Sequence, residues 1–356
     1  MIGSEGRTGQ AWRTVARAAA LMAVVVLTLA ACSGQDAADG DGSGNAVAET
    51  DADGLGTETT ESASSRDVRR PTIQLGVTDW TGARLNAVIA ERLIERRLGY
   101  PVETVQITDL LDMAVDLERG DIDAVLEVWP NTLLPTEQEA IESSSIVDLG
   151  PLGVEGRVGW YVPRYVAEGE LGVTGWEDLA DSTVASAFAT PQTGRLGRFL
   201  GTNPDYAQYD EGLVDALDLP FEVIYSGSDA ATEDAVAAAV AAEEAVLLYW
   251  WRPTALVDRY DLVEVPLPPR TEECVADIEA EAAFACAYPV DELTKLASPE
   301  LSARAPEVEQ FLRAFRLTTD QQEAMIGRVD NDGVPLLEVA DTWIAANEAI
   351  WETWFE

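Results

Sequence analysis

Short apolar runs that alternate with amphipathic stretches set the pattern of most of this chain. Residues 71–80, 101–106 and 122–129 each contain a short apolar run with β-branched residues, which predicts strands. Between them, residues 81–98 and 110–119 place apolar side chains three and four positions apart, the period of an amphipathic helix. A strand–helix–strand–helix–strand order of this kind predicts a parallel sheet with helices on both of its faces.

A second set of strand and helix patterns follows before the chain returns to the first. Further strands are expected at 157–163, 183–189, 221–225 and 246–251, and helices at 229–243, 306–317, 319–328 and 336–355. The predicted fold is an α/β, two-lobed clamshell in which each lobe is a mostly parallel sheet flanked by helices. We expect 71–158 to begin the first lobe, 159–261 to form the second, and 262–356 to complete the first.

The residues before 71 follow neither pattern. Residues 1–31 combine a basic start with an apolar stretch too short for a comfortable membrane span. The stretch ends in Leu-Ala-Ala before Cys32, which resembles a lipoprotein signal peptide cleaved before that cysteine; an ordinary secretory leader is the alternative. Two acyl chains on Cys32 would anchor the protein to the outer face of the cell membrane. Residues 32–70, rich in Gly, Ser, Thr, Asp and Glu, are expected to form a disordered acidic tether.

Charge and rare residues exclude several functions. The chain has 23 Lys+Arg against 64 Asp+Glu, a net charge of −41, so nucleic acid would be repelled as a partner. It contains no histidine, which excludes Ser-His-Asp and Cys-His catalysis. Cys274 and Cys286 form an even pair in an exported protein and are expected to form a disulfide. Without histidine or a second cysteine pair, no metal site is expected.

Two predicted strands end in tryptophan and then stop at proline. Trp129 precedes Pro130, and Trp251 lies two residues before Pro253. Because ligands bind at the carboxyl ends of strands in open α/β sheets, we expect these two rings to face one crevice. Trp80 and Trp160 fit a core and a cavity equally well, whereas Trp343, Trp351 and Trp354 are expected in a core.

Several short motifs resemble, in their order and spacing, the substrate-binding proteins of glycine betaine/choline ABC importers. They are Leu98–Glu103, Gly120–Asp123, Gly159–Pro163, Asn203–Tyr206, Tyr225–Ser228, Trp251–Pro253 and Cys286–Pro289. The resemblance implies a type II-like periplasmic binding protein without cofactor, whose partners are the permease and ATPase subunits of an importer. It also implies a box of rings at Trp129, Tyr206 and Trp251. Backbone N–H groups of Ala207 and Gln208 would bind the ligand carboxylate.

The chemistry of the ligand agrees with such a box. A trimethylammonium group has no N–H to donate, so ring faces recognise it, each contributing about 0.5–2 kcal/mol. Thr81 and Gly82, beside Trp80 at the start of a predicted helix, are a second place for the ligand's anion. A receptor for choline, carnitine or proline remains an alternative, as does a secreted hydrolase of small osmolytes.

Overall fold

The computed structural model describes residues 70–356 except 109, 205, 207–208 and 275–284. The order of elements begins with β1 (Ile73–Val77), α1 (Thr81–Leu93), η1 (Ile94–Leu98), β2 (Val102–Gln106), α2 (Leu110–Arg119), β3 (Ala124–Val128), η2 (Pro130–Thr132) and α3 (Pro135–Glu142). These elements form the first lobe, in which β1 pairs in parallel with both β2 and β3. The predicted parallel order of the first three strands is therefore present.

The second lobe contains β5, β6, β7 and β8. The chain enters it through β4 (Val147–Pro163) and continues through α4 (Arg164–Ala167), α5 (Trp176–Leu179), α6 (Ser182–Ser186), β5 (Gly197–Gly201), α7 (Asp210–Ala216), β6 (Phe221–Tyr225), α8 (Asp229–Ala241), β7 (Leu247–Arg252), α9 (Ala255–Arg259) and β8 (Leu262–Val265). Here β5 pairs in parallel with both β6 and β7.

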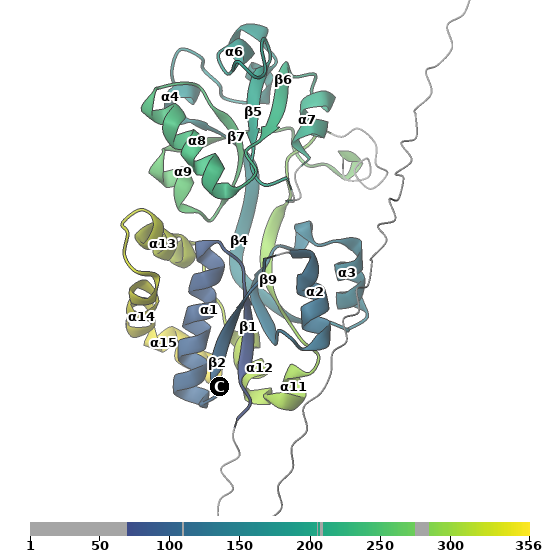
Figure 1. Ribbon diagram of the computed structural model, residues 1–356, viewed down its shortest axis with the longest axis vertical. Helices are drawn as coiled ribbons and strands as arrows, with labels where there is room; N and C mark the ends of the chain where they lie inside the picture. The colour runs from purple at the N-terminus through teal and green to yellow at the C-terminus, as the bar shows by residue number, and fades with distance from the viewer. Residues whose placement is uncertain (1–69, 109, 205, 207–208, 275–284) are drawn as a thin grey trace, which may run out of the picture. The chain divides into compact units, whose positions relative to one another are not determined.

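The remaining elements return to the first lobe. They are β9 (Val290–Ala297), α11 (Leu301–Arg304), α12 (Pro306–Ala314), α13 (Thr319–Asp330), α14 (Leu336–Ala346), α15 (Glu348–Trp351) and η3 (Glu352–Phe355). Among the described residues the strands form one sheet in the order β2-β1-β3-β9-β4-β7-β5-β6, with β8 paired to β4. The long antiparallel strands β4 and β9 join the two parallel parts (Figure 1). The α/β fold expected from the sequence is confirmed.

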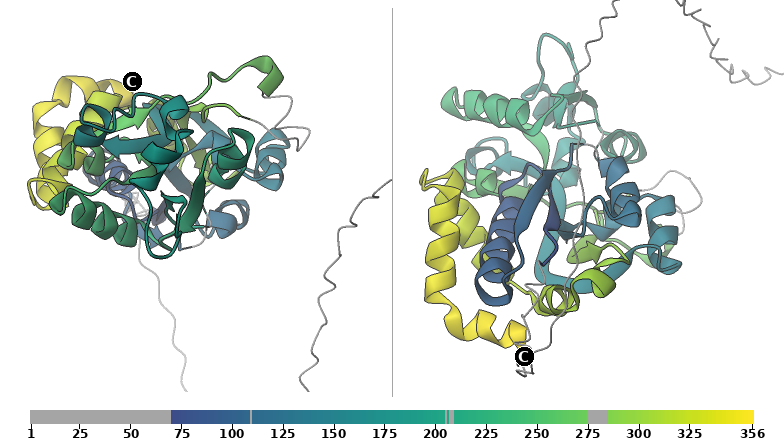
Figure 2. Two further views of the ribbon diagram at one scale, coloured as in Figure 1. Left: turned by 90° about the horizontal axis from the view of Figure 1, so that it is seen from above. Right: turned by 60° about the horizontal axis from the view of Figure 1, so that its bottom comes forward.

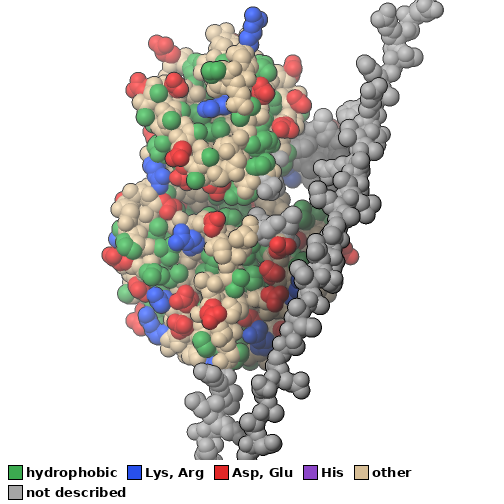
Figure 3. All heavy atoms as spheres, in the orientation of Figure 1, with side chains coloured by type: hydrophobic (Ala, Val, Ile, Leu, Met, Phe, Trp, Pro, Cys, Tyr) green, Lys and Arg blue, Asp and Glu red, His purple; other side chains and the backbone are tan. Residues whose placement is uncertain are grey.

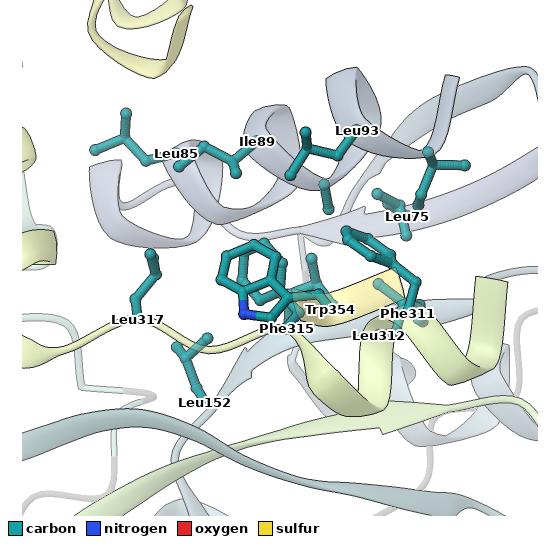
Figure 4. Close-up of a cluster of buried hydrophobic side chains, with 14 of the residues drawn as sticks. Leu75, Leu85, Ile89, Leu93, Leu152, Phe311, Leu312, Phe315, Leu317 and Trp354 are labelled. Carbon is teal, nitrogen blue, oxygen red and sulfur yellow. The ribbon is translucent and has the colours of Figure 1, made fainter. Parts of the chain in front are cut away.

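Each lobe has its own apolar core. In the first, Leu85, Ile89 and Leu93 of α1 face Phe315 and Trp354 from the C-terminal helices (Figure 4). Figure 2 shows α13 and α14 beside α1. In the second core Trp160 packs on Phe199, with ring centroids 4.8 Å apart. The predicted core positions of Trp343, Trp351 and Trp354 are confirmed, since all three are buried in the first core.

Two expectations about element position are wrong. Residues 183–189 do not form a strand, because the Asp181 carboxylate accepts a hydrogen bond from the Thr183 N–H and starts α6. The strand follows as β5, where Gly197 leaves room for the Phe221 ring. The chain also returns to the first lobe later than residue 262. β8 pairs with β4 and packs in the second core, so the return begins at β9.

Candidate functional site

An aromatic cavity lies where the carboxyl ends of β1 and β3 meet residues of the second lobe. Its volume is about 210 Å³. Its rings are Trp80, Trp129, Tyr206, Tyr249 and Trp251, which define the aromatic cavity below. Two of these rings come from the first lobe and three from the second. Of the described charged side chains, only carboxylates line this space, namely Glu127 and Glu137.

Trp251 forms the wall on the side of the second lobe. Tyr206 meets its ring edge-on with centroids 5.8 Å apart, and Tyr249 lies 6.4 Å away. Trp250, the next residue on β7, stacks on Trp251 at 4.3 Å and is itself buried in the second core. The strand β7 therefore supplies both the wall and the core residue that supports it.

Trp129 forms the facing wall and contacts both cores. Its ring lies against the backbone of Gly156 on β4, so closely that a Cβ atom at Gly156 would stand 2.4 Å from the ring. Glycine at 156 is therefore required by the close approach of the ring. The position of the Trp129 ring therefore depends on Gly156, a residue that no sequence pattern marks as functional.

A hydrogen bond to a carboxylate orients the ring of Tyr206 in the second lobe. Its hydroxyl donates a 2.9 Å hydrogen bond to Asp229 Oδ2, and Thr202 donates to Asp229 Oδ1. Burial raises the pKa of Asp229, and the two donors act in the opposite direction. This contact holds the phenol ring edge-on to Trp251.

Glu127 is a site residue that the sequence patterns missed. It lies in β3, whose residues are all buried, and its side chain lines the aromatic cavity at 4% exposure. Its oxygens accept hydrogen bonds from Trp80 Nε1 at 2.6 Å, Asn86 Nδ2 at 2.8 Å and Gln322 Nε2 at 2.8 Å. The available signal in the sequence was a carboxylate within an apolar strand. A buried charge needs hydrogen-bond partners, so a Glu at such a position indicates a polar site around it.

The electrostatics of Glu127 follow from this environment. Burial raises its pKa to about 7, while hydrogen bonds from Gln322, Trp80, Trp129 and Asn86 act to lower it. The carboxylate also fixes the Trp80 ring, which donates to it directly. Near neutral pH the group can therefore exist both as a carboxylate and as a carboxylic acid.

Other predicted site residues lie elsewhere. Trp160, for which the sequence left a core and a cavity open, is fully buried in the second core, where its Nε1 donates a hydrogen bond to Asp210, and it does not line the aromatic cavity. Thr81 and Gly82 line a neighbouring cavity together with acidic side chains rather than the aromatic cavity. At Gly82 a Cβ atom would stand 3.0 Å from Glu127 Oε2. The positive end of α1 thus lies beside a carboxylate of the protein itself.

Three of the predicted functional residues, Ala207, Gln208 and Cys32, lie outside the described residues. Cys274 and Cys286 form a disulfide, with their Cα atoms 6.3 Å apart. Within the described ranges, no group of three or more Cys, Asp or Glu side chains could hold a metal ion. No helix in those ranges combines the length and apolar character that a membrane crossing needs.

Comparison with known proteins adds an independent line of evidence. A family described as the substrate-binding domain of ABC-type glycine betaine transport systems matches residues 71–346. A trimethylamine N-oxide-binding protein of Pelagibacter ubique (strain HTCC1062) is 24% identical over 294 residues, which are 81% of this chain and 92% of that protein.

Solved structures share the fold. Lactococcal OpuAC, in a closed conformation with glycine betaine, matches with a TM-score of 0.60 and 19% identity, over 80% of this chain and all (100%) of that one. A choline-binding protein of an ABC transporter, in complex with choline, matches with a TM-score of 0.58 and 17% identity. That match covers 80% of this chain and 91% of the choline-binding protein.

Proposed function

The chain belongs to the family of substrate-binding domains of ABC-type glycine betaine transport systems, and from this premise we propose that its aromatic cavity captures a methylated amine for import. The protein acts outside the cytoplasm, where such domains meet their ligands. Its partners are the permease and ATPase subunits of an ABC importer. Glycine betaine or a related quaternary amine is the first ligand to test, in agreement with the family.

The observation that carries this proposal is the composition of the cavity wall. Five rings and the carboxylates of Glu127 and Glu137 line it, and no described Arg or Lys does. Each ring face that meets the ammonium contributes about 0.5–2 kcal/mol. Three such faces, with burial of the methyl groups, reach about −8 kcal/mol, which corresponds to micromolar affinity. Glu127 adds an opposite charge beside the rings.

Glu127 favours a second candidate, trimethylamine N-oxide, the ligand named for the Pelagibacter relative. With a pKa of about 7, the protonated form of Glu127 can donate a hydrogen bond, whereas its carboxylate repels the carboxylate of a betaine. An N-oxide carries a positive nitrogen for the rings and an oxygen that accepts such a bond. Choline, which lacks a carboxylate, is also compatible with this wall.

We propose that the bound ligand leaves unchanged. The chain has no histidine, and no described hydroxyl that lines the aromatic cavity donates a hydrogen bond to a carboxylate of that cavity, the arrangement that would activate a nucleophile. Incubation with betaine esters and related osmolytes, followed by product analysis, checks this directly. If the protein converts any of these compounds and the conversion depends on Glu127, the protein is a hydrolase and not a receptor.

The division into lobes and the membrane attachment are further parts of the proposal. β4 and β9 connect two separately packed cores, which supports closure of one lobe on the other around the ligand. We propose that Cys32 carries the lipid anchor, residues 1–31 are removed, and 32–70 tether the protein to the membrane. Labelling with a radioactive fatty acid should mark the native protein and fail for Cys32→Ala, which should appear in the medium.

Titration calorimetry of the mature domain tests the function. We expect choline, glycine betaine or trimethylamine N-oxide to bind at micromolar concentration, and carnitine or proline more weakly. Trp129→Ala and Trp251→Ala should each weaken binding by about tenfold, the loss of one ring face with its buried area. Absence of binding for every methylated amine, in a folded domain, would refute the proposal.

A further inference from the structure

Thr78 lies directly after β1, in a position that the sequence patterns did not single out. β1 pairs in parallel with β3, with Leu75 beside Ala124 and Gly76 beside Val125. Continuing this register by two residues places Thr78 beside Glu127. Neighbouring strands lie about 4.8 Å apart, and residues opposite each other point to the same face. Thr78 and Glu127 accordingly line the same cavity.

The hydroxyl of Thr78 is buried without a hydrogen-bond partner. The side chain is 4% exposed, and no residue hydrogen-bonds to Oγ1 in the part of the chain that the structure describes. Leaving a buried hydroxyl unpaired costs free energy, so such groups are rare and need an explanation. A partner that arrives with the ligand supplies one.

Two other hydroxyls of the cavity wall are already engaged. The Thr132 hydroxyl donates to the Trp129 carbonyl oxygen at 2.9 Å, and the Tyr206 hydroxyl donates to Asp229. Glu127 accepts hydrogen bonds from N–H groups of Trp80, Asn86 and Gln322. Thr78 thus offers an uncommitted donor at the base of the cavity, next to the negative charge that faces the cation.

We propose that the Thr78 hydroxyl donates a hydrogen bond to the oxygen of the bound ligand and so selects oxygen-bearing methylated amines over purely alkylated cations. This inference rests on the proposed function and assigns the polar end of the ligand within it. The rings bind the positive nitrogen with Glu127 beside it, and Thr78 donates to the ligand oxygen, to which protonated Glu127 can also donate when the ligand is an N-oxide. The O–H rotates freely, so it can serve a hydroxyl or an N-oxide oxygen.

The test compares ligands that differ only in the oxygen. Choline and trimethylamine N-oxide carry one, whereas tetramethylammonium does not. Thr78→Val keeps the shape of the side chain and removes the hydroxyl, and Thr78→Ser keeps the hydroxyl. Tyr249→Phe is the comparison variant, because it keeps the aromatic ring and removes a different hydroxyl from the opposite wall of the same cavity.

In calorimetric titrations we expect Thr78→Val to weaken choline binding by about threefold to tenfold, and N-oxide binding by about tenfold or more. Tetramethylammonium affinity should change by less than about twofold, and Thr78→Ser should behave as wild type. Thermal unfolding checks that each variant is folded. Equal losses for all three ligands, no loss, or a selective loss in Tyr249→Phe instead would overturn the assignment. Wild-type protein that binds none of the three, nor glycine betaine, would instead refute the proposed function.

Discussion

The placement of Trp129 can be disturbed without touching the ring or any charged group. Gly156→Ala adds one methyl group whose carbon would stand 2.4, 2.7 and 2.8 Å from three atoms of the Trp129 ring. Carbon atoms in favourable contact are about 3.5–4.0 Å apart, so the ring must retreat by about 1 Å or turn. Either movement removes its face from the cavity.

The expected loss follows from the energy of one ring face. At about 0.5–2 kcal/mol, displacement of Trp129 should weaken choline binding by about twofold to thirtyfold. Because Trp129 also packs on both cores, overpacking should lower the free energy of unfolding by about 1–3 kcal/mol. Calorimetric titration measures the first quantity and denaturant unfolding the second.

A control on the same strand separates the ring from general damage to β4. The three atoms nearest to a Cβ atom at Gly159 all belong to the Glu264 side chain, with Oε1 the nearest at 3.3 Å. Gly159→Ala should therefore leave choline affinity within about twofold of wild type. If folded Gly156→Ala binds choline as tightly as Gly159→Ala does, Trp129 contributes no face to the ligand and the reasoning fails.

Burial raises the pKa of Glu127 to about 7, so choline affinity should rise from about pH 6 to about pH 8 as the carboxylate ionises, and calorimetry of Glu127→Gln should show no rise. In the ligand-free protein the folded pKa exceeds the unfolded value of about 4.3, so folding binds a proton between these values. The stabilisation from this proton is full below about pH 4 and lost as the pH passes 7, and denaturant unfolding of Glu127→Gln should show a smaller decline than wild type. An ion pair between Arg252 Nε and Glu323 Oε1, 3.0 Å apart, joins β7, the strand of Trp251, to α13, the helix of Gln322. Glu323→Gln should weaken choline binding by about twofold to fivefold, with no further loss in an Arg252→Gln background; additive losses would contradict this coupling.

The sequence predicted the fold well because its signals are local. Alternation of apolar strands with amphipathic helices requires only the periods of the two structures, and both lobes carry it. The helix at α6 and the delayed return through β9 were missed for a different reason. A single capping bond at Asp181 and the pairing of β8 with β4 decided them, and neither is visible in the period of a short apolar run.

The candidate site was predictable only where a local rule applied. Trp129 and Trp251 stand at strand ends before prolines, and the structure places both in one cavity. Trp160 also lies in a predicted strand that ends at a proline. Its Nε1–H, however, donates a hydrogen bond to the buried Asp210, 50 residues later in the sequence, and this contact keeps the ring in the second core. Glu127 depends on partners from α1 and α13, the latter 195 residues away, which no local pattern reports.

Most of the negative charge of the chain lies on its surface and not in the aromatic cavity. Figure 3 shows Asp and Glu side chains spread over both lobes on the visible face. A charge distributed in this way attracts cations generally and repels anionic partners. Any selection among cations must then come from the aromatic cavity, which is lined by five rings and by the buried carboxylates of Glu127 and Glu137.

The central claim is that the aromatic cavity binds a permanent positive charge, and choline can be compared directly with its neutral carbon isostere. In the isostere a tert-butyl group replaces the trimethylammonium group, so size and apolar area are kept while the charge is lost. Competitive calorimetric titration should show choline binding at least about hundredfold more tightly, the sum of several ring faces and the Glu127 charge. Equal affinity for the two compounds would contradict the account.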